Sequence, residues 1–314
     1  MSTASKLGWI GIGRMGYAMA ERLAAQGADL TVWNRTRAKA EPLAAKGAKI
    51  ADDLAALAAC DIVFVMVSTY DDVHEVIAGP RGLLSGSGTA KPKLIVECSS
   101  ISLEGSGALR ALLAARGIEL LAAPVSGNAK VIKAGRLTFV CSGPRSAFDA
   151  ALPYMRMIGP SASYVGEGEL ARIVKICHNV FLGVVTQSLA EITVLAQKAG
   201  VPRHAFLDFM NQSVMGSTFT RYKTPAFVNL DFKVTFTPEL LRKDLDLGLD
   251  AGRRFDVPLP LASVTRDILQ SLIGHGAVDE DFAKLIVHHA RASGIELAPE
   301  NVVVDDGLSG GSGK

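Results

Sequence analysis

The stretch that decides the fold is LGWIGIGRMGYAMAERLAAQG, residues 7–27. It begins with a short apolar run, passes through three closely spaced glycines, and continues as an alanine-rich segment. A strand, a Gly-x-Gly-x-x-Gly turn and a helix in this order predict a dinucleotide-binding βαβ unit. Gly11 permits the tight turn, Gly13 lets the backbone approach a pyrophosphate, and Gly16 lets the helix pack against the strand.

The same alternation extends outward from this stretch. Further strands are predicted over residues 29–33, 61–67, 94–98, 119–123 and 137–142. Helices are predicted over residues 17–26, 36–46, 54–59, 108–116 and 148–154. Strands that alternate with helices predict an α/β, Rossmann-type, doubly wound parallel sheet.

The alternation stops near Gly166, and no convincing strand follows it. Residues 169–198 are predicted to form one long helix, followed by helical patterns over 204–212, 238–255, 260–274 and 282–293. We therefore expect a dinucleotide-binding domain over residues 1–166 and an all-helical domain over 167–299, begun by the long interdomain helix. Residues 300–314 read as a flexible tail because the chain ends in a Gly/Ser-rich run.

Composition excludes several classes of protein. Apolar residues make up 49% of the 314 residues, so a large core is expected and disorder is not. The net charge is +2 and no basic stripe with interleaved aromatics is present, so no nucleic-acid partner is expected. The longest apolar stretch carries Lys175, His178, Asn179 and Glu191, which argues against a membrane span.

Cysteine and histidine usage indicates a reducing compartment and no metal. The four cysteines form no CxxC pair and are predicted to be buried, reduced thiols. No histidine pair has metal-ligand spacing, so no metal site is expected. Residues 1–6 lack the apolar core of a secretory signal, and we therefore predict a cytoplasmic protein.

The end of the second strand indicates which dinucleotide is bound. An NAD site usually carries an acidic residue at this point, whereas this chain has Asn34-Arg35-Thr36. Arg35 can pair with a 2′-phosphate through its planar fork, Thr36 can donate to the phosphate, and Lys39 adds positive charge nearby. We therefore predict NADP(H); the alternative is that Arg35 is a solvated surface charge.

The long helix carries the candidate proton-transfer residue. Lys175, His178 and Asn179 are three and four residues apart and share a helix face, which Arg172 joins from the preceding turn. The neighbouring residues are apolar, and desolvation of an ammonium lowers its pKa toward neutrality, where it can exchange a proton. The alternative for Lys175 is a lysine that extends its head to solvent at the helix edge. His178 is equally well explained as a residue hydrogen-bonded within the helix packing.

A Pro/Gly loop supplies a candidate carboxylate site. Residues 122–128 (AAPVSGN) follow the strand predicted to begin at Glu119. Loops at the carboxyl ends of parallel strands face the ligand crevice. Ser126 and the amides of Gly127 and Asn128 can bind a carboxylate there, although a simple turn is also consistent with this composition.

Taken together, the segments from Leu7 to Ser293 resemble the 3-hydroxyisobutyrate dehydrogenase family, within the β-hydroxyacid dehydrogenases. The matching motifs are the glycine turn with Met15, the segment 124–127 followed by 134–137, and Gly166 with Lys175 and Asn179. A fourth match is the pair Lys243-Asp244.

The resemblance implies a reaction and a set of roles. Lys175 would be the general acid/base assisted by Asn179, and the substrate would be a small carboxylate such as a β-hydroxyacid. The implied substrate-binding residues are Ser126, Gly127, Asn128 and His178. The implied cofactor-binding residues are Gly11, Gly13, Arg14, Met15, Gly16, Asn34, Arg35, Thr36, Met66, Val67, Ser99 and Lys243. Such proteins usually form homodimers or homotetramers through the helical domain.

Several positions depart from the family pattern. Ala122 replaces an acid, Asn128 replaces a glycine, and Glu169 and Ala171 stand where glycines usually precede the lysine. His178-Asn179 resembles the 6-phosphogluconate dehydrogenases more closely. These changes leave the substrate open.

Two other functions are consistent with the fold. Imine reductases resemble this architecture and its Asn-Arg-Thr segment but generally lack the lysine. A non-catalytic dinucleotide-binding module would not need Lys175 at all.

Overall fold

The computed structural model describes residues 5–86 and 89–308. Residues 309–314, most of the predicted Gly/Ser tail, lie outside the described residues, as do Met1 to Ala4. The chain divides into two compact units after Lys175. We call residues 1–175 the N-terminal unit and residues 176–314 the C-terminal unit.

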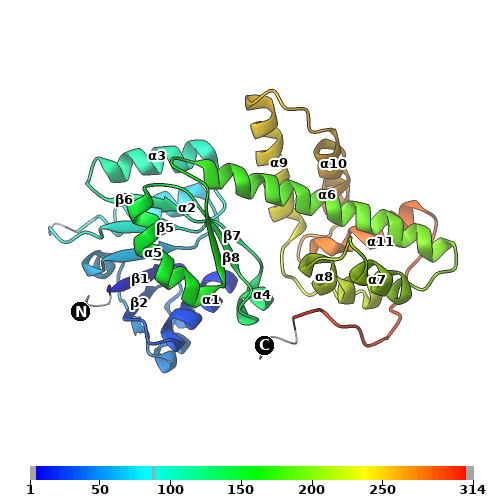
Figure 1. The fold of residues 1–314 in the computed structure, drawn as a ribbon, viewed down its shortest axis with the longest axis horizontal. Helices are drawn as coiled ribbons and strands as arrows, with labels where there is room; N and C mark the ends of the chain where they lie inside the picture. The colour runs from blue at the N-terminus through cyan, green and yellow to red at the C-terminus, as the bar shows by residue number, and fades with distance from the viewer. Residues whose placement is uncertain (1–4, 87–88, 309–314) are drawn as a thin grey trace. The chain divides into compact units, whose positions relative to one another are not determined.

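The N-terminal unit is built on a six-stranded parallel sheet (Figure 1). The strands are β1 (Leu7–Ile10), β2 (Leu30–Trp33), β3 (Lys49–Ile50), β4 (Ile62–Val65), β5 (Leu94–Glu97) and β6 (Glu119–Ala122). Their order is β3-β2-β1-β4-β5-β6, so the chain reverses direction across the sheet between β1 and β4. The α/β doubly wound fold is confirmed, and ligands of such sheets bind at this switch point.

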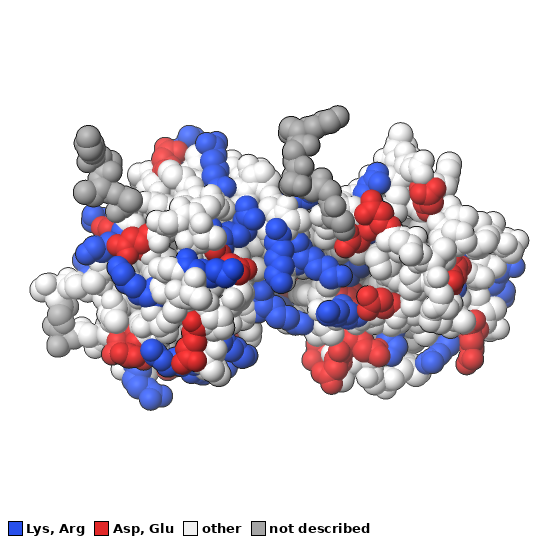
Figure 2. Space-filling model, turned by 90° about the horizontal axis from the view of Figure 1, so that it is seen from below, with Lys and Arg blue, Asp and Glu red and all other residues white. Residues whose placement is uncertain are grey.

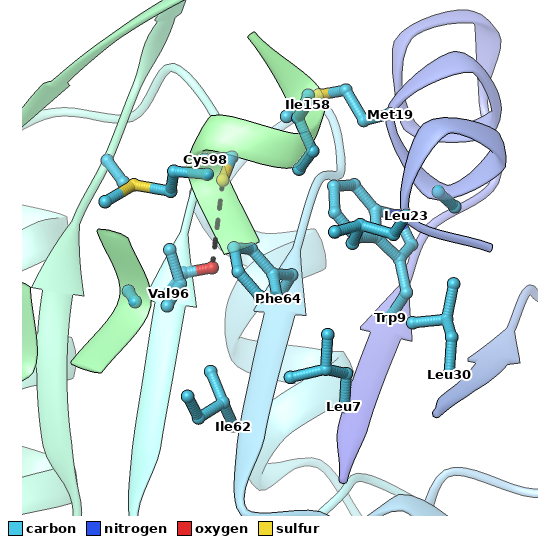
Figure 3. Close-up of a cluster of buried hydrophobic side chains, with 14 of the residues drawn as sticks. Leu7, Trp9, Met19, Leu23, Leu30, Ile62, Phe64, Val96, Cys98 and Ile158 are labelled. Carbon is cyan, nitrogen blue, oxygen red and sulfur yellow. Dashed lines mark hydrogen bonds between the residues drawn. The ribbon is translucent and has the colours of Figure 1, made fainter. Parts of the chain in front are cut away.

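Helices cover both faces of the sheet (Figure 1). They are α1 (Arg14–Ala25), α2 (Tyr70–Ala78), α3 (Leu103–Ala114) and α5 (Arg145–Ile158). Successive residues of a strand point to opposite faces, so Trp9 and Phe64 pack with α1 and α5, whereas Ile10 and Val65 pack with α2 and α3. Figure 3 shows the first of these cores, in which the rings of Trp9 and Phe64 stack with centroids 5.4 Å apart. Both faces being buried explains the continuous apolar runs in the strands.

A smaller sheet completes the N-terminal unit. It contains β7 (Val125–Ser126), β8 (Thr138–Cys141) and β9 (Ser161–Tyr164), with α4 (Ala129–Lys133) between the first two. Strand β7 is antiparallel to β8, and Ser126 is paired with Thr138. This pairing fixes the loop that follows Pro124.

Two helix predictions were wrong in type. Residues 36–46 form two 3-10 turns, Arg37–Lys39 and Glu41–Lys46, instead of one α-helix. Pro42 has no N–H to donate in the middle of this segment, which disfavours a continuous helix. Residues 54–59 likewise form a 3-10 turn, Ala55–Ala59.

The secondary structure of the C-terminal unit's described residues consists of helices joined by loops, with no strand (Figure 1). The long helix α6 (Leu170–Lys198) leads into α7 (Arg203–Gln212), α8 (Thr218–Asn229), α9 (Pro238–Arg254), α10 (Pro260–Gly274) and α11 (Leu285–Ala292). Helix α8 escaped the sequence analysis because three threonines and Pro225 give it a poor intrinsic propensity. A capping box of Ser217 with Thr220 starts it, and buried Phe227 anchors it.

Residues 300–308, part of the predicted tail, are anchored to the C-terminal unit. The Asn229 side chain donates to the Val302 carbonyl (2.8 Å) and accepts from the Val302 N–H (3.3 Å). Glu300 accepts from the backbone N–H groups of Arg203 (2.7 Å) and His204 (2.9 Å). This carboxylate therefore satisfies two free donors at the start of α7.

Helix α6 is long and apolar enough to span a membrane by length and composition alone. In the structure, 44% of its most apolar window is buried inside the protein. Charged side chains of both signs are mixed over the face shown in Figure 2.

The cysteine prediction holds for three positions and fails for one. Cys60, Cys98 and Cys141 are buried, and burial raises the pKa of the Cys60 thiol to about 11. Cys177 is exposed, because it lies on the outer side of α6. All four are free thiols.

Candidate active site

The glycine turn has the geometry that a bound dinucleotide requires. Gly11 has φ +97°, and a Cβ there would lie 2.2 Å from the Met66 carbonyl oxygen. A Cβ on Gly16 would lie 1.9 Å from the Gly11 carbonyl oxygen, whereas one on Gly13 would meet nothing within 4 Å. Two glycines therefore allow close backbone packing, and the middle one faces open space.

Helix α1 begins directly after this turn. Its first residue is Arg14, and no side chain caps the helix at Gly13. The N–H groups of the first turn and the helix dipole favour an anion at this point. The residues present therefore fit the pyrophosphate of a dinucleotide, with exposed Arg14 and half-buried Met15 beside it.

Asn34 joins the two parts of the cofactor site. Its side-chain oxygen accepts from the Ile12 N–H (2.9 Å), and its amide nitrogen donates to the Thr36 carbonyl (2.8 Å). The Asn34 amide thus fixes the glycine turn to the end of β2, and exposed Arg35 stands between Asn34 and Thr36 in the chain. This bridging role was not visible from the sequence, which indicated Asn34 as a potential cofactor contact in place of an acidic residue.

Two further basic residues, Arg37 and Lys39, follow Arg35 in the chain. Arg37 donates to the Asp52 carboxylate (2.7 Å) and lies near Glu41 (3.7 Å), so its charge is already balanced. Lys39 is exposed.

The carboxyl ends of β4 and β5 place the next predicted residues together. The Val67 N–H donates to the Ser99 hydroxyl oxygen (2.9 Å), and the Ser99 N–H donates to the Glu97 carboxylate (2.7 Å). Ser99 and Glu97 are fully buried, whereas Met66 and Val67 are half-buried. Because β1, β4 and β5 are neighbours in parallel register, these residues share the sheet edge with the glycine turn.

The predicted carboxylate loop is tightly folded. Ser126 is half-buried in β7, and Gly127 has φ +135°, a conformation that favours glycine. The Asn128 side-chain oxygen accepts from the N–H groups of Lys130 (2.9 Å) and Val131 (3.1 Å). Asn128 therefore caps α4, and this oxygen is already engaged.

In helix α6, Asn179 is held from two sides. Its amide nitrogen donates to the Asp244 carboxylate (2.5 Å), and its oxygen lies 2.8 Å from Nδ1 of His178. Since the amide oxygen can only accept, Nδ1 of His178 must carry the proton. Asn179 and Asp244 are buried, and Lys243 lies 3.6 Å from the Asp244 carboxylate.

Lys175 lies one turn before Asn179 on α6 and is half-buried. Arg172, which we expected beside it, instead has its guanidinium buried against Glu97 at the end of β5. The sequence analysis did not assign roles to Asp244 or Glu97. A charged residue at the end of an apolar strand, as in LIVE over residues 94–97, was the available signal, because such a charge needs a partner.

The described residues contain no cluster of three His, Cys, Asp or Glu side chains that could hold a metal. The glycine turn, the switch point and the strand-end residues define an NAD(P)-binding protein of the Rossmann type.

Family comparisons agree with this class. A model of the NAD binding domain of 6-phosphogluconate dehydrogenase matches residues 6–166. A model described as the NAD-binding region of NADP-dependent 3-hydroxyisobutyrate dehydrogenase matches residues 169–289. The chain belongs to the β-hydroxyacid dehydrogenase family of NAD(P)-dependent oxidoreductases.

Individual relatives span nearly the whole chain. The 2-(hydroxymethyl)glutarate dehydrogenase of Eubacterium barkeri is 31% identical over 95% of this chain and 99% of that protein. The chloroplastic glyoxylate/succinic semialdehyde reductase 2 of Arabidopsis thaliana is 28% identical over 89% of this chain and 78% of that protein. A crystal structure of 3-hydroxyisobutyrate dehydrogenase from Salmonella typhimurium has a TM-score of 0.80 and 25% identity, covering 89% of this chain and 98% of that one.

Imine reductases share the fold. The enzyme of Myxococcus stipitatus in complex with NADP+ has a TM-score of 0.57 at 23% identity, covering 89% of this chain and 98% of that chain. At this identity the likeness concerns the fold alone.

Proposed function

We propose that this protein is an NADP(H)-dependent dehydrogenase that interconverts a small β-hydroxyacid and its aldehyde or keto acid. Lys175 serves as its general acid/base. The observation that carries the proposal is the arrangement on α6, where Lys175 precedes by one turn an asparagine that Asp244 and His178 hold in place. A fixed amide beside a lysine suits the handling of one substrate oxygen.

The support for NADP(H) comes from the end of β2. Asn34 carries no negative charge to accept from ribose hydroxyls, and both ends of its amide are engaged with backbone groups. Arg35 and Thr36 are exposed next to it. A guanidinium at this position can form a bidentate pair with a 2′-phosphate.

The nicotinamide, when bound, supplies or accepts the hydride. In the reducing direction, the carbonyl carbon of the substrate gains the hydride and the electron pair of the C=O bond moves to oxygen. Lys175 donates its proton to that oxygen and later regains one from solvent. In the oxidising direction, Lys175 takes the hydroxyl proton. Asn179, whose amide Asp244 holds in place, assists Lys175 at the same oxygen.

The substrate carboxylate is assigned to Ser126 and the backbone N–H of Gly127. Ser126 is half-buried in β7 and Gly127 is exposed, so both are accessible from the loop. Asn128 contributes through its capping of α4, which fixes the loop, and His178 contributes through Nε2. The C-terminal unit is proposed to mediate a homodimer or homotetramer, and the free thiols are consistent with a cytoplasmic location.

Substitution of Lys175 by alanine tests the mechanism. We expect turnover to fall by a factor on the order of 10²–10⁴ with unchanged NADPH affinity, because the proton-transfer group is lost and the cofactor site is not. Steady-state kinetics with a panel of small aldehyde acids and keto acids, and fluorescence titration with NADPH, measure the two quantities. Lys198→Ala, at the other end of α6, is the matched control. Unchanged turnover of Lys175→Ala would remove the lysine from the mechanism.

Substitution of Arg35 by alanine tests the cofactor preference. The variant should bind NADPH about 10- to 100-fold more weakly, because a hydrogen bond to a charged group contributes roughly 1.5–3 kcal/mol. Binding of NADH should change much less. Arg37→Ala is the control, since Arg37 is paired with Asp52. Equal weakening of both cofactors would contradict a 2′-phosphate role.

Imine reduction is the second candidate, favoured only by the shared fold. Including cyclic imines and amines in the same screen distinguishes the two functions. Faster turnover of cyclic amines than of hydroxyacids would favour imine reduction. Tight NADPH binding with no turnover of any substrate would indicate a non-catalytic module.

A further inference from the structure

Arg172 is a buried charged side chain near the candidate site. It is 1% exposed, and its ion-pair partner Glu97 is 0% exposed. Its guanidinium donates to the Glu97 carboxylate, to the Ser99 carbonyl (2.7 Å) and to the Ser106 hydroxyl (3.1 Å). We call Arg172, Glu97, Ser99 and Ser106 the Arg172 clasp.

The Arg172 clasp binds the backbone of Ser99 at both its carbonyl and its N–H group. Arg172 donates to the Ser99 carbonyl, while the Glu97 carboxylate accepts from the Ser99 N–H (2.7 Å). The Ser99 hydroxyl in turn accepts from the Val67 N–H (2.9 Å). One charged pair thus fixes the backbone at the carboxyl end of β5 and, through it, that of β4.

The clasp also fixes the start of α6. The Ser106 hydroxyl, which accepts from Arg172, donates to the Glu169 carboxylate just before the helix. Glu169 accepts from Arg110 Nε (2.6 Å), and Arg110 also donates to the Gly168 carbonyl (2.8 Å). Two arginine–glutamate pairs therefore hold the first turn of α6 against the ends of β5 and α3.

Lys175 stands three residues after Arg172, about 4.5 Å further along the helix axis at 1.5 Å per residue. Any rotation or shift of the first turn of α6 moves Lys175 with it. Displacement of a reacting group by about 1 Å can reduce turnover about 100-fold.

We propose that Arg172 is a positioning residue for the reaction, which sets Lys175 and the Ser99–Val67 edge of the cofactor site in one fixed relation through the Arg172 clasp. This inference rests on the proposed role of Lys175. It explains why a charged pair occupies a fully buried position, where apolar side chains of similar volume are often equally stable or more stable.

The test separates positioning from stability by removing one partner and then both. Arg172→Met leaves Glu97 as a buried, unpaired charge, and the variant should be strongly destabilised. Adding Glu97→Met removes that charge, and the double variant should recover most of the lost thermal stability. Arg172→Lys keeps the charge but loses the planar fork that reaches acceptors on three residues. Arg145→Met with Asp149→Met removes an exposed Arg–Asp pair on α5 and is the matched control.

We expect kcat of the double variant and of Arg172→Lys to remain roughly 10- to 100-fold below that of the parent. The shape of the kcat–pH profile should be retained, because Lys175 is still present. NADPH affinity, measured by fluorescence titration, should change less than about 3-fold, since Asn34 and the glycines hold the phosphate end.

Full recovery of kcat together with stability in the double variant would overturn the proposal and leave Arg172 a structural residue. If the double variant does not fold, Arg172→Lys decides: a folded variant with parental kcat overturns it, and a low kcat supports it. A large loss of NADPH affinity would also overturn it, because Arg172 would then serve cofactor binding. Lys175→Ala retains the clasp, so unchanged turnover in that variant refutes the lysine mechanism separately.

Discussion

The two units treat their apolar surface differently. Among the described residues before Leu170, no large hydrophobic side chain is exposed. From Leu170 onward many are, including Phe181 at 69%, Leu195 at 69%, Phe209 at 69% and Leu261 at 68% exposure. Among its described residues, the N-terminal unit exposes large apolar side chains only at Leu170 and Val174, both on α6, whereas the C-terminal unit exposes many.

The exposed apolar residues of α6 are regularly spaced along the helix. Val174, Phe181 and Leu195 are separated by seven and fourteen residues, which places them on one side of the helix. An isolated exposed hydrophobic residue needs no explanation, but a helical stripe resembles a helix–helix interface. We propose that a second copy of the chain covers these apolar side chains of α6.

The largest expected effect tests whether the C-terminal unit folds independently. Its buried Lys223–Asp281 pair (2.5 Å) also receives the N–H and hydroxyl of Thr235. Asp281→Asn leaves Lys223 buried without its counter-charge and should destabilise the unit by about 3–5 kcal/mol. Both tryptophans, Trp9 and Trp33, lie in the N-terminal unit. Urea unfolding should therefore show an early loss of far-UV circular dichroism before the tryptophan signal changes.

A common shift of both signals would show that the two units unfold together and would contradict independent unfolding of the C-terminal unit.

Acid unfolding tests the contribution of the Lys223–Asp281 pair independently. Burial raises the pKa of the Asp281 carboxyl, but the Lys223 ammonium and the hydrogen bonds outweigh it, so the pKa lies below the ordinary 3.8. The stabilisation by this pair is therefore present above pH 3.8 and is lost as the pH falls through the lowered value.

The second prediction concerns the stripe on α6. Phe181→Glu combined with Leu195→Glu should weaken self-association at least about 100-fold, since burying one such side chain contributes about 1.5–3 kcal/mol. Analytical ultracentrifugation over a concentration series measures it. Val303→Glu alters a fully exposed valine outside α6 in the chain and should leave the association state unchanged. A parent protein that is monomeric at all concentrations would disprove the partner assignment.

The smallest expected effect concerns the segment after α11. Burial raises the pKa of Glu300, but hydrogen bonds from His204 and Arg203 and the Arg203 charge bring it below the ordinary 4.5. Glu300→Gln should cost about 1–2 kcal/mol at pH 7, because a charged helix cap is lost.

The difference in melting temperature between the parent and Glu300→Gln should have its largest value above pH 4.5 and should decrease as the pH falls below 4.5. Glu296→Gln, at an exposed position in the same segment, is the control. A difference that persists at pH 3 would show that the carboxylate charge is not the cause.

The sequence was sufficient for the fold class because two signals agreed over long stretches. Apolar strands such as residues 62–65 and the glycine turn each have one structural interpretation, and the long helix appeared with nearly the observed bounds. Helix α8 was missed because buried Lys223 and Phe227, rather than intrinsic propensity, stabilise it. Propensity is a weak guide wherever tertiary contacts decide.

For the site, the sequence provided residue types but not their partners. It indicated Asn34, Asn128 and Asn179 as potential ligand contacts, and the structure shows all three engaged in the protein's own hydrogen bonds. It placed Arg172 beside Lys175, whereas the guanidinium is buried against Glu97, a contact between residues far apart in the chain. Such contacts depend on topology, and no local pattern encodes them.

The Asn34 bridge has a consequence for anyone who wishes to redesign the cofactor preference. An aspartate at this position would supply the acidic group typical of NAD sites, and it could still accept from the Ile12 N–H. It could not donate to the Thr36 carbonyl, and its charge would face that oxygen. The turn that carries Arg35 would therefore lose the hydrogen bond from residue 34 that holds it. Given the NADP(H) preference proposed above, engineering toward NADH has to begin at Arg35 and leave the neighbouring amide intact.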